Sequence, residues 1–278
     1  MKPLLFSLFV VLTGLSVSLL YAQDSSASLR SKTAHRGFSS VAPENTMVAY
    51  KLAVEAGADS VECDVYRTAD GVLVLSHDGN VKRTTGRDAD ITKITYDEVS
   101  KLDAGSWKDK KFAGERIPTL EEYLRFLKGS TAIPFVEIKQ EGIIGDVVAL
   151  FKKLEMTNEV FVISFSPKVL TELKQIAPTI KFAYLLGYKV EGTADSYADT
   201  LITKITTDAE KVGTKNVSLN HDMVSQKLVK TLHDKGYKVL VWTVNDAKRM
   251  NELLDWGVDG ITTDKIDLLN EVIKNRGK

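Results

Sequence analysis

Five short polar motifs bring together residue types that suit the cleavage of a phosphate ester. Each motif stands at the end of an apolar run, where a strand would meet a loop. Three carboxylates suit a hard divalent cation, two imidazoles suit proton transfer, and an arginine and a lysine suit a phosphate. The five motifs are His35-Arg36-Gly37, Glu44-Asn45-Thr46, Glu62-Cys63-Asp64, His77-Asp78 and Glu137-Ile138-Lys139.

The first two carboxylates, Glu62 and Asp64, are two positions apart in a predicted strand, so both side chains point to one face. Val61, Cys63 and Val65 alternate with them and require a buried opposite face. Two buried carboxylates repel each other unless a cation lies between them, which favours a metal site. The alternative is an ordinary solvated strand face.

Glu137 ends the apolar run 133–138 and supplies a third carboxylate at a strand end. Oxygen ligands favour Ca²⁺ or Mg²⁺, whereas zinc would favour cysteine or more histidine. Lys139, two positions on, is expected to contact the phosphate together with Arg36. A purely structural Glu137–Lys139 ion pair is the alternative interpretation.

Two of the four histidines, His35 and His77, accompany the carboxylates. One neutral imidazole could take a proton from the attacking oxygen, while the other, protonated, gives one to the leaving oxygen. The sequence does not determine which is the base. His221 follows a strand and either contacts substrate or has no role, and His233 lies in an amphipathic helix and is expected at the surface.

The residues around Arg36 are expected to position its guanidinium. Arg36 can bind two phosphate oxygens, and Gly37 allows a tight backbone turn. Glu44 is expected to brace Arg36 or to approach substrate hydroxyls. Asn45 is predicted to cap a helix that begins at Thr46.

Two residues near the end of the chain complete the candidate site. Trp242 ends a strand and is predicted to offer an apolar surface with its N–H available to a substrate. Asp264 follows the last strand and is predicted to cap the final helix, a structural role.

Strand-like and helix-like segments alternate along almost the whole chain. Eight such strands predict a (β/α)8 TIM barrel, one domain over residues 30–278, whereas a doubly wound sheet would require a glycine-rich phosphate loop that is absent from the sequence. The predicted strands are 33–35, 60–67, 133–139, 160–165, 181–186, 217–221, 238–244 and 259–262; the predicted helices are 46–56, 119–128, 143–154, 167–176, 197–212, 225–235 and 246–255.

A further strand-like run, 72–77, follows the second barrel strand after a turn that contains Asp70-Gly71. So short a connection predicts an antiparallel hairpin, with Arg67 opposite Val72 and therefore His77 beside Glu62. The hairpin begins an insert, residues 68–118, which is expected to form a small cap over the site.

The charge balance of the chain and its first 22 residues indicate where the protein is located and which partners it binds. Lys+Arg and Asp+Glu are both 37, so no basic field predicts nucleic-acid binding. Residues 1–22 resemble a secretory signal peptide, which predicts a secreted or bacterial periplasmic protein without stable membrane insertion after cleavage; an uncleaved anchor is the alternative. Cys63, the only cysteine, is expected to be buried, and oligomeric state is left open.

Taken in order, these motifs resemble the glycerophosphodiester phosphodiesterase family. The resemblance implies a TIM barrel that hydrolyses small-molecule glycerophosphodiesters, such as glycerophosphocholine or glycerophosphoethanolamine, to sn-glycerol 3-phosphate and an alcohol. It implies acid/base roles for His35 and His77, one Ca²⁺ or Mg²⁺ on Glu62, Asp64 and Glu137, and phosphate contacts from Arg36 and Lys139. The motifs are His35-Arg36-Gly37, Pro43-Glu44-Asn45-Thr46, Glu62-Cys63-Asp64-Val65, Asp70-Gly71, Ser76-His77-Asp78, Glu137-Ile138-Lys139, Trp242-Thr243-Val244-Asn245 and Asp259-Gly260-Ile261-Thr262-Thr263-Asp264.

Several alternatives remain open. The attacking oxygen is either the glycerol 2-hydroxyl, which gives a cyclic phosphate, or a metal-activated water. A glycosidase would use two of the carboxylates but would leave both histidines and both cations without a role. An inactive barrel that only binds phosphodiesters and a lipid-active phospholipase are further alternatives.

Overall fold

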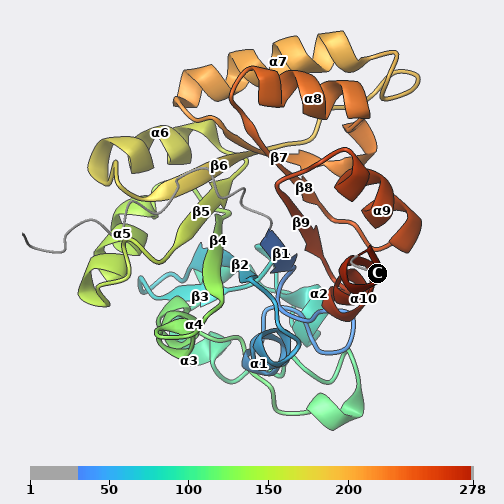
Figure 1. Ribbon diagram of the computed structural model, residues 1–278. Coiled ribbons are helices and arrows are strands. Elements are labelled where there is room, and N and C mark those ends of the chain that lie inside the picture. Colours follow the sequence, from blue (N-terminus) through green and yellow to red (C-terminus); the bar gives the residue numbers. More distant parts are fainter. Residues whose placement is uncertain (1–30, 277–278) are drawn as a thin grey trace, which may run out of the picture.

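Eight parallel strands close into a barrel with helices on its outside (Figure 1). The computed structural model describes residues 31–276, so the predicted signal peptide 1–22 lies outside the described residues. The strands follow the order β1-β9-β8-β7-β6-β5-β4-β2, and a β1–β2 pairing closes the ring. The predicted TIM barrel is confirmed.

The barrel strands end within two residues of their predicted ends, because apolar runs and turn residues mark them clearly in the sequence. They are β1 (Ser31–Ala34), β2 (Ser60–Arg67), β4 (Ile133–Ile138), β5 (Phe161–Ser164), β6 (Lys181–Leu186), β7 (Asn216–Asn220), β8 (Lys238–Trp242) and β9 (Gly260–Thr263).

The helices bury one apolar face each against the barrel, as their three- and four-residue spacing predicts. Ser166 caps the helix that begins with Pro167, and Asp246 caps the helix after β8, where its side chain accepts from Arg249 N–H. The helices are α1 (Met47–Glu55), α4 (Leu120–Leu127), α5 (Ile144–Lys153), α6 (Pro167–Ile176), α7 (Ala198–Val212), α8 (Gln226–Asp234), α9 (Ala247–Asp255) and α10 (Ile266–Arg276).

The layer between strands and helices is the main core. Val61, Cys63 and Val65 of β2 all have 0% exposure and pack in this layer, so their alternation places Glu62 and Asp64 on the inner face of the barrel. The expectation of a buried Cys63 is therefore confirmed.

The insert between β2 and α4 has a small apolar core of its own. It begins with an antiparallel strand, β3 (Leu73–Leu75), paired with the end of β2. Its other elements are α2 (Lys82–Thr85), η1 (Ile91–Lys93), α3 (Tyr96–Val99) and η2 (Lys110–Phe112). The apolar core of the insert comprises Val74, Val81, Ile91, Ile94, Val99, Ala104 and Ile117.

The predicted hairpin is present, but its predicted register is wrong by one residue. Arg67 pairs with Leu73 rather than Val72, because Thr68 N–H and Oγ1 both bond to Val72 C=O and leave a three-residue loop. Asp64 C=O consequently accepts from Ser76 N–H, at 3.0 Å. His77 lies beyond the paired residues, so it is not held opposite Glu62.

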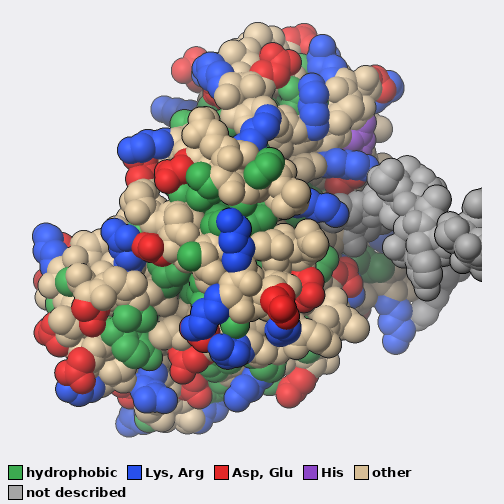
Figure 2. All heavy atoms as spheres, turned by 90° about the vertical axis from the view of Figure 1, so that its left-hand side faces the viewer, with side chains coloured by type: hydrophobic (Ala, Val, Ile, Leu, Met, Phe, Trp, Pro, Cys, Tyr) green, Lys and Arg blue, Asp and Glu red, His purple; other side chains and the backbone are tan. Residues whose placement is uncertain are grey.

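The surface has mixed charge. On the face shown in Figure 2, basic and acidic side chains are interspersed rather than gathered by sign, which agrees with equal totals of 37. Among residues 31–276, no helix combines the length and the apolar character needed to cross a bilayer.

Candidate active site

Three carboxylates meet inside the barrel at the carboxyl-terminal ends of neighbouring strands. Glu62 and Asp64 come from β2 and Glu137 from β4, whose register sets Asp64 beside Glu137. One oxygen of each lies within 4.8 Å of the others, and all three residues are buried. The structure thus brings together the three residues that the sequence predicted as metal ligands.

Burial and mutual repulsion change the protonation of this cluster. Burial, with Asp64 and Glu137 nearby, raises the pKa of Glu62 well above its usual value. Burial and the Asp64 charge raise the pKa of Glu137 to about 7. Burial also acts to raise the pKa of Asp64, but Lys139, Arg36, His77 and the Asn45 hydrogen bond together outweigh it and hold that pKa below its usual value.

The cluster has the properties expected of a hard-cation site. Glu62 Oε1 and Asp64 Oδ1 are buried and have no hydrogen-bond partner among the described residues. A buried unsatisfied carboxylate oxygen is costly, and a divalent cation would satisfy both. Three carboxylates leave room for water and substrate in the coordination shell of Ca²⁺ or Mg²⁺.

Arg36 reaches the cluster from the loop after β1. Its backbone N–H donates to Glu62 Oε2 at 2.7 Å, its Nη1 donates to Glu44 Oε1 at 2.9 Å, and its Nε lies 3.5 Å from Asp64 Oδ2. Glu44 thus braces Arg36, as one of its two predicted roles required. The loop depends on Gly37, whose φ is +80° and where a Cβ would lie 2.7 Å from the Ala49 carbonyl carbon.

Lys139 approaches the cluster from the opposite side. Its Nζ lies 2.9 Å from Glu137 Oε1 and 3.5 Å from Asp64 Oδ1. The Glu137–Lys139 ion pair therefore exists in this structure, but Asp64 also contacts the ammonium group. Two cations, Arg36 and Lys139, flank the three carboxylates, which suits a ligand that carries negative charge.

Each candidate acid/base histidine is held by its own carboxylate. His35 Nδ1 lies 2.7 Å from Asp264 Oδ1, and His77 Nδ1 lies 2.8 Å from Asp78 Oδ1. A carboxylate accepts hydrogen bonds, so Nδ1 carries a proton in both rings, and Nε2 is the nitrogen through which each ring can accept or donate a second proton. Burial lowers the pKa of His77, although the Asp64 charge acts to raise it.

Asp264 has a different role from the predicted helix cap. Besides His35, it accepts hydrogen bonds from Ser39 Oγ at 2.9 Å and Asn245 Nδ2 at 2.6 Å. Burial acts to raise the pKa of Asp264, but the contact with His35 and the hydrogen bonds from Asn245 and Ser39 together outweigh it and lower that pKa. The sequence did contain a signal, because a closed barrel sets the last strand beside the first.

Asn45 also differs from its prediction. Thr46 is the cap of α1, and its side chain accepts from Ala49 N–H. The Asn45 side chain instead donates to Asp64 Oδ2 at 2.8 Å and accepts from Tyr50 O–H at 2.9 Å. Its φ of +55°, which asparagine tolerates, turns the amide towards β2.

Trp242 ends β8, but its N–H is not available. Nε1 donates to Ser218 C=O at 3.0 Å, so that part of the prediction is wrong. The indole packs edge-on against Phe165, with ring centroids 5.4 Å apart. Trp242 therefore contributes apolar surface only.

The other two histidines lie apart from the carboxylate cluster. His221 borders a separate hollow with Thr193 and Arg249. His233 lies at the surface of α8 as expected, with its side chain 33% exposed, and its Nε2 bonds to Asp259 Oδ2 at 2.8 Å.

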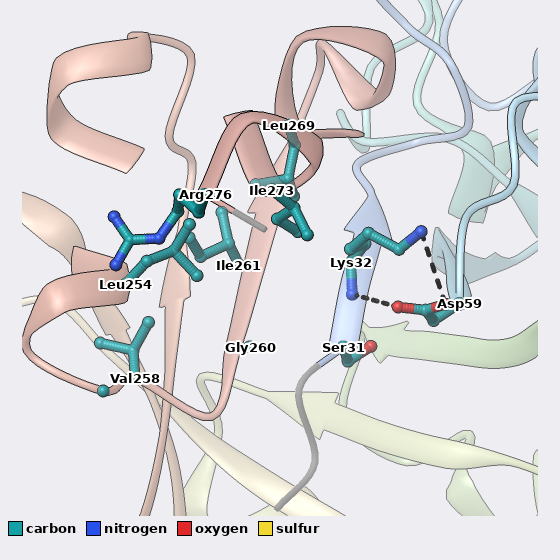
Figure 3. Close-up of a pocket in the computed structure, with 11 residues that line it drawn as sticks. Ser31, Lys32, Asp59, Leu254, Val258, Gly260, Ile261, Leu269, Ile273 and Arg276 are labelled. Atoms are coloured by element: carbon teal, nitrogen blue, oxygen red, sulfur yellow. Dashed lines mark hydrogen bonds and ion pairs between the residues drawn. The ribbon is translucent and has the colours of Figure 1, made fainter. Parts of the chain in front are cut away.

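A larger hollow lies at the opposite end of the barrel. It has a volume of about 490 Å³ and is bordered by the starts of β1 and β9 and by α10. Figure 3 shows Lys32 and Asp59 paired on one side of it and apolar side chains such as Leu254 and Ile273 on the other. It lies away from the carboxyl-terminal strand ends, where TIM barrels carry their chemistry.

Comparison with known proteins gives one consistent result. A model of the glycerophosphoryl diester phosphodiesterase family matches residues 35–268. A glycerophosphodiester phosphodiesterase of Caldanaerobacter subterraneus is 33% identical over 88% of this chain and 98% of its own. One of Bacillus subtilis is 32% identical over 87% and 85%.

Solved structures of phosphodiesterases are also similar to this chain. A phosphodiesterase of Oleispira antarctica in complex with the product sn-glycerol-3-phosphate superposes with a TM-score of 0.76 at 28% identity, over 88% of this chain and 96% of that one. A glycerophosphodiester phosphodiesterase of Agrobacterium tumefaciens gives a TM-score of 0.73 at 29% identity, over 87% and 99%.

Proposed function

Because the chain belongs to the glycerophosphoryl diester phosphodiesterase family and has glycerophosphodiester phosphodiesterase activity, we propose a specific course for its reaction. The substrates are small glycerophosphodiesters such as glycerophosphocholine or glycerophosphoethanolamine. The products are sn-glycerol 3-phosphate, the compound bound in the Oleispira antarctica structure, and the free alcohol. The enzyme uses one divalent cation and two histidines.

The observation that carries the proposal is the pair of unsatisfied buried oxygens, Glu62 Oε1 and Asp64 Oδ1, beside Glu137. These three residues would hold the cation. When bound, it would supply positive charge at the reacting phosphate and lower the pKa of an oxygen nucleophile. Ca²⁺ and Mg²⁺ both suit three carboxylates.

Arg36 and Lys139 position the phosphate. Arg36 is fixed by Glu44 and by its own N–H bond to Glu62, so its guanidinium keeps one orientation. Lys139 Nζ faces the same carboxylates from β4. Fixed cations at the phosphate oxygens stabilise the charge that builds there in the transition state.

We assign the proton acceptor to His77 and the proton donor to His35. Burial lowers the pKa of His77, so its Nε2 is unprotonated at neutral pH and can accept a proton from the attacking oxygen. The side chain of Asp264 bonds to His35, Ser39 and Asn245, and Ser39 and Asn245 are neutral. The negative charge of Asp264 therefore complements a positive charge on the His35 ring. His35 Nε2 then donates its proton to the departing alkoxide oxygen, which leaves as the alcohol.

Release of glycerol 3-phosphate from a panel of diesters, with and without chelator, tests the proposal. We expect release with all glycerol-containing diesters, its loss on chelation, and its return with Ca²⁺ or Mg²⁺. Activity that survives complete removal of metal would refute the cation. A substrate that lacks the 2-hydroxyl distinguishes the two nucleophiles, because only direct attack by water would leave its turnover unchanged.

The two histidine roles are separable by leaving group. His35→Ala and His77→Ala should each lose roughly 10²–10⁴-fold with glycerophosphocholine. A nitrophenyl diester releases a stable phenolate and needs no acid, so it should restore His35→Ala but not His77→Ala. The reverse pattern would exchange the two roles.

Secretion stays part of the proposal. Residues 1–22 carry the signal pattern, and determination of the amino-terminal residue of the exported protein would test cleavage there.

A further inference from the structure

Arg83 of the insert binds two carboxylates at once. Its Nε donates to Asp78 Oδ2 at 2.6 Å, and its Nη1 and Nη2 donate to the two oxygens of Glu44 at 2.8 and 2.7 Å. Neither the family motifs nor the predicted site included this residue. Its planar fork satisfies three acceptors in one orientation, which an ammonium group cannot do.

Each of these carboxylates also holds a residue of the reaction. Asp78 presents its other oxygen to His77 Nδ1 at 2.8 Å, and Glu44 Oε1 accepts from Arg36 Nη1 at 2.9 Å. A single guanidinium therefore connects the proton acceptor on one side with the phosphate-binding arginine on the other. These residues come from two separate loops, the one after β1 and the one after β3.

The insert restrains Arg83 in turn. The Arg83 guanidinium carbon lies 5.8 Å from the centroid of the Trp107 ring, and Trp107 Nε1 donates to Ala104 C=O at 2.8 Å. Lys108 Nζ donates to Ser39 C=O at 2.7 Å, which fixes the same stretch to the loop after β1. The position of Arg83 thus depends on the folded insert.

We propose that Arg83 is a positioning residue that aligns His77 and Arg36 with each other through Asp78 and Glu44. The inference rests on the proposed function, in which those two residues act on the same phosphodiester. The Arg83 side chain is 43% exposed, so its ion pairs add little to stability in water. Its effect is on geometry, where a misplacement of about 1 Å can cost 10²-fold in rate.

The experiment compares Arg83→Gln with Arg87→Gln. Arg87 lies in the same insert, has a similar exposure of 39%, and pairs with Glu98 at 2.6 Å, away from the site. We expect Arg83→Gln to lose about 10–100-fold in kcat/KM for glycerophosphocholine, as supporting residues typically do, while Arg87→Gln stays near the wild type. Thermal unfolding should shift equally little for both.

A double-mutant cycle separates positioning from a general loss of structure. If Arg83 acts through Asp78, then Asp78→Asn should cost much less kcat in the Arg83→Gln background than in the wild type. Arg83→Lys keeps the charge but not the fork, so it should recover only part of the loss. It also provides the comparison if Arg83→Gln fails to fold.

The outcomes distinguish this inference from the proposed function. A wild type that releases no glycerol 3-phosphate overturns both. A wild type with normal turnover, together with equal rates for the Arg83 and Arg87 variants, additive cycle energies or full recovery by lysine, overturns only the positioning role.

Discussion

The interior of the barrel has two halves with opposite chemistry. On β1, β2 and β4 its upper layer is charged, with three buried carboxylates flanked by Arg36 and Lys139. On β5, β6 and β8 the inner face is apolar, and Phe135 of β4, one layer below Glu137, belongs to that half. The apolar half comprises Phe135, Phe161, Ile163, Ala183, Leu185 and Leu240, with Trp242 packed against it.

The strand β4 shows how the two halves depend on each other. Phe135 stacks on Phe161, with centroids 4.9 Å apart, and two residues later Glu137 joins the carboxylate cluster. Buried charges that repel each other oppose folding, whereas packed rings favour it. We infer that the apolar half supplies stability that fixes the charged half, and that the two halves can be disrupted separately.

The largest effect should follow a change in the charged half, Glu62→Gln. A bound cation supplies several kcal/mol of transition-state stabilisation, so loss of a ligand should lower turnover by roughly 10³-fold. Because the pKa of Glu62 is raised well above its usual value, glutamine resembles the protonated side chain, and the ion-free variant should be as stable as the wild type at neutral pH. Turnover, metal content and thermal unfolding measure the three expectations.

Glu141→Gln is the control, since this exposed carboxylate follows β4, the strand that carries Glu137, but bonds Ser166 and Lys168 instead. It should retain both metal and turnover. A Glu62→Gln enzyme that kept full activity would refute the metal site.

The sequence predicted the carboxylates of the charged half better than it predicted the side chains that hold the site residues in place. Glu62 and Asp64 could be placed on one face because strand alternation is a local property. The His35–Asp264 contact joins positions 229 apart, and a local pattern does not reveal which loop side chains meet at a barrel end. Asp264 was consequently predicted as a cap, although the closed β1–β9 pairing brings it beside His35.

Turn chemistry explains the remaining differences. The hairpin register shifted by one residue because Thr68 closes the loop with its own side chain, an option that Asp70-Gly71 alone does not show. Asparagine is a common helix-cap residue, but the positive φ of Asn45 directs its side-chain amide to Asp64. Arg83 stands in an irregular insert, where no periodicity indicates its partners.

The second largest effect should come from the apolar half, with Phe161→Ala. Removal of a buried phenyl ring typically lowers the free energy of unfolding by about 3–5 kcal/mol, and here it also removes the stacking on Phe135. Turnover per folded molecule should stay close to that of the wild type, because Phe161 lies one layer below Glu137. Denaturant unfolding and active-site titration check this; loss of turnover without loss of stability would contradict the separation of the halves.

We expect pH to have a smaller effect on cation affinity, which titration of Glu137 should change by up to about tenfold per pH unit. The pKa of Glu137 is raised to about 7 in the ion-free site by burial and by Asp64, so below that pH a cation must displace its proton. Ca²⁺ affinity should therefore fall as pH drops below about 7. Calorimetric titrations between pH 5.5 and 8.5 measure this slope.

The raised pKa of Glu137 also makes the free energy of unfolding depend on pH. The usual pKa of glutamate is 4.5, so protonation of Glu137 stabilises the ion-free folded protein fully below pH 4.5, and this stabilisation is lost as pH rises through about 7. Bound Ca²⁺ offsets that loss, so the increase in Tm on adding Ca²⁺ should grow across this range. Glu137→Gln should flatten the dependence, and an affinity independent of pH in the wild type would contradict the assigned pKa.

The smallest effect should come from the apolar rim, with Phe165→Ala. Phe165 is 46% exposed and packs edge-on against Trp242, so it offers a ring to the alcohol portion of a substrate. An aromatic contact is worth about 0.5–1.5 kcal/mol, so KM for a nitrophenyl diester should rise about 2–10-fold. The KM for glycerophosphoethanolamine, which has a polar alcohol, should not change. Equal changes for both substrates would mean that the ring supports the barrel end rather than the alcohol, and the apolar half would then serve stability alone.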